Sequence, residues 1–128
     1  MYAYNFLGLK TTKIVGTEVL PAGKARIRLE FAYDGPGLGK GGTGTILVNG
    51  KKVAEGKIDR THSGIFSADE GADVGQDGET PVSDDYRQGD NKFTGKIQKV
   101  VVEVGPVKLA AVDHEQLRKS NIALKAGE

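Results

Sequence analysis

The chain contains no cysteine and no tryptophan among its 128 residues. Without a thiol it cannot form a disulfide, bind zinc through cysteine or use a cysteine nucleophile. Its aromatic residues are four tyrosines and four phenylalanines, so composition gives little support to a surface on which sugars stack. The basic residues do not cluster with these aromatic residues, and we therefore expect no nucleic acid as a partner.

No stretch of the sequence has the roughly 20 consecutive apolar residues that a helix needs to cross a bilayer. We therefore expect no membrane partner. Residues 1–13 also lack the basic region followed by an apolar region that marks a secretory signal peptide. Because a chain without cysteine is compatible with any redox environment, the sequence indicates no particular compartment.

Motifs of catalysis and nucleotide binding are missing as well. None of the serines, at positions 63, 67, 83 and 120, lies in a G-x-S-x-G nucleophile elbow, and His62 and His114 occur in separate contexts. Residues 37–42 match G-x-G-x-x-G, but a strand pattern rather than a helix follows them, so a dinucleotide-binding turn is not expected. We predict a chain with no catalytic residues and, apart from the calcium discussed below, no cofactor.

Glycine, by contrast, is abundant: the 19 residues are about twice the average usage of roughly 7%. This content favours many tight turns between short strands. Residues 25–33 alternate strictly between apolar and polar positions, which predicts a strand with one wet face. Residues 43–58 form a second unit, in which Asn49-Gly50 is typical of a type I′ hairpin turn.

A third clear strand is predicted over residues 96–104, where Val100, Val102 and Val104 share one phase. Ile97 is out of phase with them, which indicates a β-bulge near Gln98 and Lys99. Shorter strands are expected over residues 2–7, 11–15, 64–68 and 107–111.

Together these strands predict an all-β fold. With short turns and no interleaved helices, we expect an antiparallel β-sandwich, of the jelly-roll or concanavalin-like kind, over residues 1–112. Asp113 and Gln116 have the spacing of a capping box. Residues 113–128 are therefore expected to form a short C-terminal helical tail.

An acidic segment interrupts the strand pattern between residues 70 and 91. Asp73, Asp77 and Asp84 occupy positions 1, 5 and 12 of a calcium-loop spacing, but position 3 is Gly75 and no helix flanks the segment. It is therefore not an EF-hand, and a different oxygen-ligand site for Ca²⁺ is one interpretation. The other interpretation is that these carboxylates cap backbone amides of their own loop. Tyr86 is the tyrosine of this segment and the candidate ligand-binding residue.

Several short blocks, taken in order, resemble the C-terminal region of large bacterial arylsulfatases. The order and spacing of the blocks carry this resemblance, which extends from about residue 4 to residue 104. The blocks are residues 4–9 (YNFLGL), 20–24 (LPAGK), 29–35 (LEFAYDG), 37–42 (GLGKGG), 48–53 (VNGKKV), 66–70 (FSADE), 73–75 (DVG), 81–86 (PVSDDY) and 93–96 (FTGK). Residues 76–80 (QDGET) depart from the tract expected after Asp-Val-Gly.

The resemblance implies a β-sandwich appended to a catalytic domain that hydrolyses sulfate esters. The family's nucleophile is a cysteine or serine in C/S-x-P-x-R, converted to formylglycine beside a calcium site. This chain has no cysteine, and none of its serines is followed by x-Pro-x-Arg, so no catalytic residue of the family can be assigned to it. We expect a non-catalytic accessory domain of an arylsulfatase-like parent, periplasmic or secreted, that packs on and orients the catalytic domain in cis.

Two further hypotheses belong to other classes. One is a lectin-like module that binds carbohydrate, with or without Ca²⁺, through residues 70–91. The other is an autonomous hydrolase, from which we expect no turnover. The accessory-domain hypothesis predicts that one face keeps apolar side chains exposed in the isolated chain.

Overall fold

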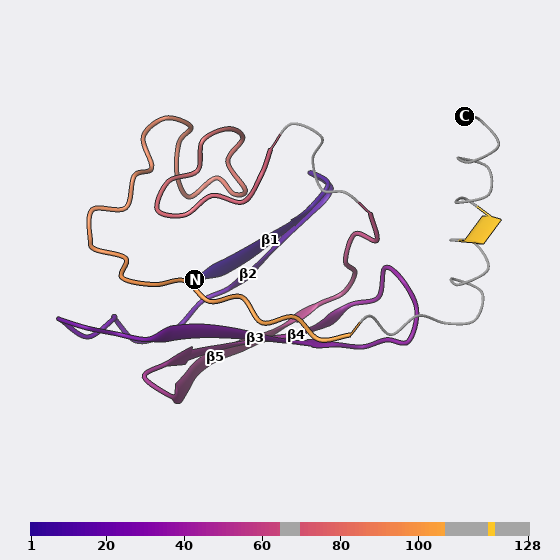
Figure 1. Ribbon diagram of the computed structural model, residues 1–128, viewed down its shortest axis with the longest axis horizontal. Coiled ribbons are helices and arrows are strands. Elements are labelled where there is room, and N and C mark those ends of the chain that lie inside the picture. The colour runs from indigo at the N-terminus through magenta and orange to yellow at the C-terminus, as the bar shows by residue number, and fades with distance from the viewer. Residues whose placement is uncertain (65–69, 107–117, 120–128) are drawn as a thin grey trace.

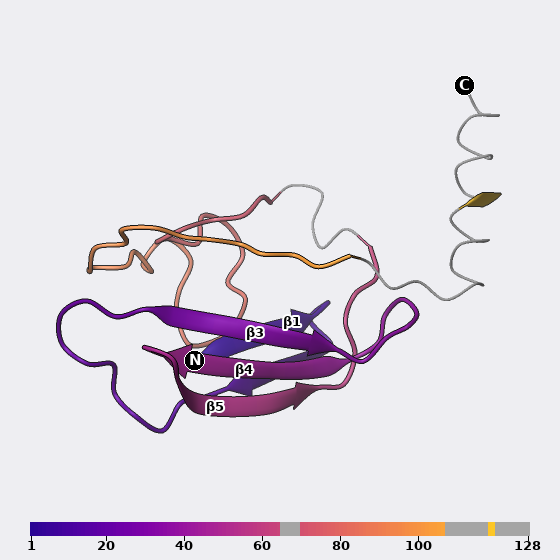
Figure 2. The ribbon, with the colours of Figure 1, turned by 60° about the horizontal axis from the view of Figure 1, so that its bottom comes forward.

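The computed structural model describes residues 1–64, 70–106 and 118–119. Within them the chain is all-β, with five antiparallel strands in two sheets. Sheet A is the hairpin of β1 (Tyr2–Phe6) and β2 (Lys10–Ile14). Sheet B has the order β3-β4-β5 and is built from β3 (Ile27–Tyr33), β4 (Gly42–Val48) and β5 (Lys51–Ile58). Figure 2 shows the three strands of sheet B side by side, with the hairpin against one face.

Both hairpin turns require left-handed backbone. Asn49 and Gly50 have φ values of 50° and 83°, as the sequence predicts for a type I′ turn between β4 and β5. Leu7 and Gly8 have φ values of 52° and 73° between β1 and β2. A leucine rarely adopts this conformation, and the Asn5 side chain helps hold the turn by accepting a 2.7 Å hydrogen bond from the Gly8 amide.

The register of sheet B puts its apolar residues on one face. Gly44 pairs with Gly56 and Ile46 with Ala54 across β4 and β5, while Leu29 of β3 pairs with Ile46. Directly opposed residues share a face, so the phases expected from the sequence are confirmed here. The register shifts between Ile46 and Leu47.

The core forms where sheet A packs on sheet B. Ile14, Ile46 and Ile58 are its buried apolar residues among those described. The Ile14 side chain lies over the paired glycines: a Cβ at Gly44 would be 2.7 Å from its Cδ1, and a Cβ at Gly56 would be 2.8 Å from its Cγ1. The two glycines therefore create the recess that admits Ile14 and brings the sheets together.

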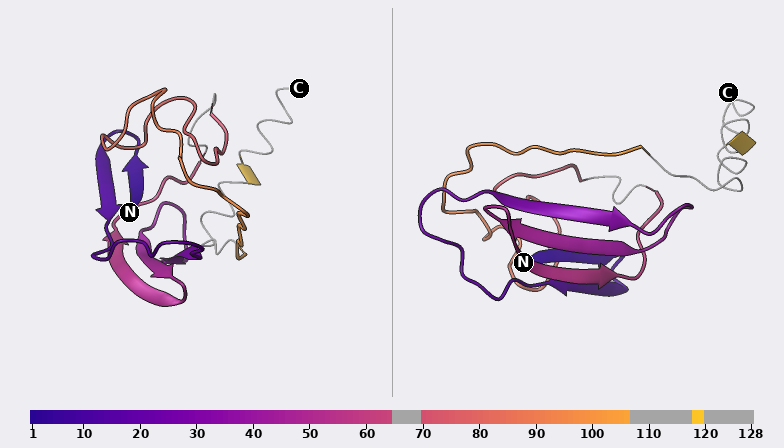
Figure 3. Two further views of the ribbon diagram at one scale, coloured as in Figure 1. Left: turned by 90° about the vertical axis from the view of Figure 1, so that its left-hand side faces the viewer. Right: turned by 90° about the horizontal axis from the view of Figure 1, so that it is seen from below.

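The strand expected over residues 96–104 is not part of either sheet. Figure 3 shows residues 96–106, drawn in orange, running in the same direction as β3 on the side away from β4. The bulge expected near Gln98 and Lys99 is therefore not formed, and a register shift occurs in the β4–β5 pair instead. The alternating valines indicate a strand, but they do not specify its partner.

Other expectations fall largely outside the described residues. The segments 64–68 and 107–111 are among them, apart from Gly64. The helical tail expected over 113–128 is described only at Arg118 and Lys119.

Candidate functional site

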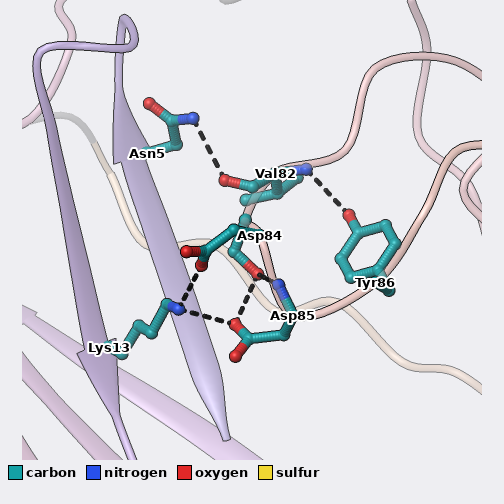
Figure 4. A network of polar contacts seen from close by, with 7 residues as sticks. Asn5, Lys13, Val82, Asp84, Asp85 and Tyr86 are labelled. Carbon is teal, nitrogen blue, oxygen red and sulfur yellow. Dashed lines mark hydrogen bonds and ion pairs between the residues drawn. The ribbon is translucent and has the colours of Figure 1, made fainter.

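The acidic segment is folded back on the N-terminal hairpin. In Figure 1 it forms the looped region beside β1 and β2. The Asn5 amide of β1 donates a 3.0 Å hydrogen bond to the Val82 carbonyl. Lys13 of β2 reaches Asp84 at 2.6 Å and Asp85 at 2.9 Å. Figure 4 shows that these contacts fasten the middle of the segment to sheet A.

Lys13 and Ser83 stabilise the charged forms of Asp84 and Asp85. Its ammonium group lowers the pKa of Asp84 by hydrogen bonding and by Coulombic attraction. The pKa of Asp85 is lowered first by the hydroxyl of Ser83, which donates a 2.7 Å hydrogen bond to it, and then by Lys13. The same hydrogen bonds raise the pKa of Lys13. All three groups are therefore held in their charged forms near neutral pH.

A second group of contacts joins the last residue of the segment and Tyr86 to its middle. The Asn91 side chain accepts a 2.8 Å hydrogen bond from the Asp77 amide and donates to the Asp77 and Arg87 carbonyls, each at 3.0 Å. The Tyr86 hydroxyl donates to the Asp77 carboxylate and accepts a 2.8 Å hydrogen bond from the Val82 amide. Partial desolvation raises the pKa of Tyr86, and the hydrogen bond to Asp77 raises it further.

The remaining carboxylates cap the backbone of the segment. Asp73 accepts a 2.8 Å hydrogen bond from the Gly78 amide, and Glu70 accepts one of 2.8 Å from the Thr80 amide. These contacts agree with the interpretation that the acidic residues stabilise their own loop. In the described part of the chain, no group of three or more histidine, cysteine, aspartate or glutamate residues is placed to hold a metal ion. Asp73, Asp77 and Asp84, the candidate calcium ligands, each have a different partner here.

An open hollow of about 530 Å³ lies inside this segment. Carboxylates and two aromatic rings line it, with Phe93 56% exposed. Its lining is Glu70, Gly71, Asp73, Gly75, Gln76, Asp77, Thr80, Val82, Tyr86, Asn91 and Phe93. Tyr86, the candidate ligand-binding residue, lies at this hollow. Sequence reasoning did not single out Asn91 or Phe93 for this site, since only the fold brings them beside Asp77 and Gly75.

His62 and Ser83 both have hydrogen-bond partners. The His62 amide donates a 2.8 Å hydrogen bond to the Tyr4 hydroxyl, and its Nδ1 accepts one of 3.1 Å from the Gly64 amide. Ser83 is buried and bonded to Asp85. These contacts give both residues a role in holding their loops.

An exposed apolar surface lies on β3. Four of its side chains lie on the same face of sheet B as Ile46 and remain exposed, at 59% for Ile27, 43% for Leu29, 41% for Phe31 and 39% for Tyr33. We call these four residues the β3 row. Apolar side chains of the neighbouring segment are also exposed, from 44% at Ile97 to 87% at Val104. The described part of the sheet therefore presents a continuous apolar strip that sheet A does not cover.

Comparison with known proteins returned no matching family model, no matching curated protein and no matching solved structure. Among the described residues, no helix is both long and apolar enough to cross a membrane.

Proposed function

We propose that this chain is a non-catalytic accessory domain of an arylsulfatase-like protein. In this proposal the β3 row packs on the domain that hydrolyses the sulfate ester and orients it. The observation that carries the proposal is the exposed apolar row on a strand whose other face is polar. An apolar strip of this kind on a single sheet is characteristic of an interface, whereas scattered exposed apolar residues are ordinary.

The geometry explains why the domain would need a partner. Ile14 fills the recess over β4 and β5, whereas every residue of β3 remains exposed. Full burial of a leucine, isoleucine or phenylalanine side chain contributes about 1.5–3 kcal/mol. Covering the β3 row would therefore stabilise both this domain and its position on the partner. We infer that sheets A and B belong to an antiparallel β-sandwich whose second layer is completed at β3 by other residues of the full protein.

The resemblance to the arylsulfatase region supplies the identity of the partner. The decisive observation is whether the parent reading frame encodes C/S-x-P-x-R upstream of this chain. If it does, the two regions can be expressed as separate polypeptides and purified together. We expect this chain to bind the upstream region, and we expect the chain alone to hydrolyse no aryl sulfate.

The docking face can be tested with a matched pair of variants on one strand. Phe31→Lys places a charge in the β3 row, whereas Ala32→Lys places the same charge on the opposite face of β3. We expect Phe31→Lys to abolish copurification with the upstream region and Ala32→Lys to leave it intact. Equal binding by both variants would contradict docking through this face.

The hollow in the acidic segment favours a second candidate, a carbohydrate-binding module that Ca²⁺ assists. The exposed ring of Phe93 could stack on a sugar, and the surrounding carboxylates could accept its hydroxyl hydrogen bonds or bind the ion. This function predicts that millimolar Ca²⁺ raises the melting temperature, because a ligand of the native state stabilises it. Asp77→Asn should remove that rise, and Asp59→Asn, which neutralises a carboxylate paired with Lys10, should keep it.

A glycan array then tests sugar binding directly. Binding that Phe93→Ala abolishes would support this candidate. An absence of both calcium stabilisation and glycan binding would eliminate it.

A further inference from the structure

The two edges of sheet B are protected to very different degrees. β5 has lysines at positions 51, 52 and 57 and a register shift opposite Ile46 and Leu47. Lysines and bulges are the features by which proteins keep an edge strand from pairing with another chain. β3 has neither lysine, proline nor bulge, and all seven of its residues are exposed.

The hydrogen bonds of β3 show which of its backbone groups are free to pair. Asn49 donates its amide to the Arg26 carbonyl, and Asp34 donates its amide to the Gly41 carbonyl. The antiparallel ladder between these two points has no register shift. The even-numbered residues of β3 therefore direct their backbone groups toward β4. Ile27, Leu29 and Phe31 direct theirs away from the sheet.

We propose that the free edge of β3 pairs with β3 of a second copy of this chain, antiparallel and centred on Leu29. This interface goes beyond the proposed docking function, because it uses the edge of the strand rather than its apolar face. It requires residues 96–106, which lie on the side of β3 away from β4 in Figure 3, to move aside. In this register Leu29 pairs with Leu29 of the second copy, and Ile27 pairs with Phe31 of the second copy. Each of these pairs exchanges hydrogen bonds through the outward-facing amides and carbonyls.

Arg28 and Glu30 form a 3.0 Å ion pair within one chain, and their charges favour this register over a shift of the centre by one residue to either side. Centring on Leu29 sets Arg28 opposite Glu30 of the second copy, and the two-fold axis repeats the pair. These are non-hydrogen-bonded positions, where opposed side chains come closest. Shifting the centre to Arg28 or to Glu30 would instead oppose two like charges, which is destabilising in a sheet.

The other candidate for this edge is the segment 96–106 of the same chain, which runs beside β3 in Figure 3. This segment runs parallel to β3. If Val100, Val102 and Val104 lie on the apolar face, Lys99 and Glu103 lie on the polar face, where they match the charges of β3 poorly. Setting Lys99 opposite Glu30 brings Glu103 beside the aspartate that follows β3. Setting Glu103 opposite Arg28 brings Lys99 beside a lysine. In the dimer, Arg28 and Glu30 each lie opposite a residue of opposite charge. Neither register of segment 96–106 achieves this for both of its charged residues.

Sedimentation equilibrium of the whole chain over a range of concentrations tests the proposal. We expect a reversible dimer. Arg28→Glu and Glu30→Arg should each weaken self-association by about tenfold or more, because each variant turns two attractive cross-strand pairs into repulsive ones. The double variant Arg28→Glu/Glu30→Arg should restore the dimer, since it recreates the pairs with exchanged signs.

The ion pair Lys52–Glu55 on β5 provides the matched control. Its side chains are 60% and 50% exposed, compared with 61% and 51% for Arg28 and Glu30. Lys52→Glu should therefore leave the dimer unchanged. Leu29→Pro is a further test, because it removes an amide that faces away from β4 and so should prevent pairing while circular dichroism still shows a folded sheet.

Three results would overturn the proposal. The first is a chain that is monomeric at every concentration, as expected if residues 96–106 occupy the edge. The second is a dimer that both Arg28→Glu and Leu29→Pro leave intact. The third is a dimer that Lys52→Glu weakens as much as Arg28→Glu does.

Discussion

Ile14 covers the β4–β5 half of sheet B, whereas every residue of β3 is exposed. The two halves share one continuous hydrogen-bonded sheet and one apolar face. They differ in what lies above that face: paired glycines admit an isoleucine on one side, and on the other the β3 row stays exposed within the described part of the chain. The comparison separates residues that stabilise the isolated chain from residues that are available to a partner.

The largest expected difference between the halves comes from truncating one apolar side chain in each. Ile14→Ala should lower the free energy of unfolding by about 2–5 kcal/mol, because it leaves a cavity over the glycine recess. Leu29→Ala should lower the free energy of unfolding by much less than Ile14→Ala, since the Leu29 side chain is 43% exposed. Urea denaturation of both variants measures the contrast. Equal losses would show that β3 is covered in solution.

The glycine recess itself gives the next largest effect. Gly56→Ala should destabilise the chain by about 1–3 kcal/mol, because the added methyl group would overpack the site against Ile14. Gly50, where an added Cβ meets no atom within 4 Å, has a different cause of strain, its φ of 83°. Combining Gly44→Ala with Ile14→Val tests the mechanism. Valine lacks the Cδ1 that a Cβ at Gly44 would meet at 2.7 Å, so it should recover part of the loss caused by Gly44→Ala and none of the loss caused by Gly50→Ala.

The ion pairs of Lys13 should make a smaller, pH-dependent contribution. The pKa values of Asp84 and Asp85 are lowered in the folded chain. Their contribution is therefore fully present above the unfolded-state pKa of about 3.9 and is lost as pH falls through the folded-state value. Lys13→Gln should reduce the fall in melting temperature between pH 5 and the acid range. A variant that keeps the full acid sensitivity of the unmodified chain would contradict this assignment.

At alkaline pH the contribution of Lys13 to stability depends on pH with the opposite sign. The pKa of Lys13 is raised, so its contribution is fully present below the unfolded-state pKa of about 10.4 and is lost as pH rises through the folded-state value. All three groups are exposed to solvent to differing degrees, and salt should weaken both effects. Melting temperatures at low and high salt provide the check.

The local part of this structure could be predicted from the sequence. The alternation in residues 25–33 and the Asn49-Gly50 turn depend only on residues that are close in the sequence. They predict β3, β4 and β5. The recess was not predictable, because Gly44 and Gly56 become meaningful only when the register places them opposite each other. The valines of 96–104 have a clear strand pattern but no ladder, since pattern alone does not name a partner strand.

The acidic segment shows the same limit. Its carboxylates allow two interpretations from the sequence, and the partner of Asp84 could not be predicted because Lys13 lies 71 positions away along the chain. Tyr86 was identified because it is the tyrosine of the segment, while Asn91 and Phe93 reach the hollow through folding of the loop.

The most direct test of the account is amide hydrogen exchange along β3 in a dilute sample of the whole chain. We expect slow exchange at Arg28 and Glu30, whose amides face β4, and fast exchange at Leu29, whose amide faces away from the sheet. Slow exchange at Leu29 in a monomeric sample would mean that the chain covers this edge itself, and would contradict the claim that β3 is open to a partner.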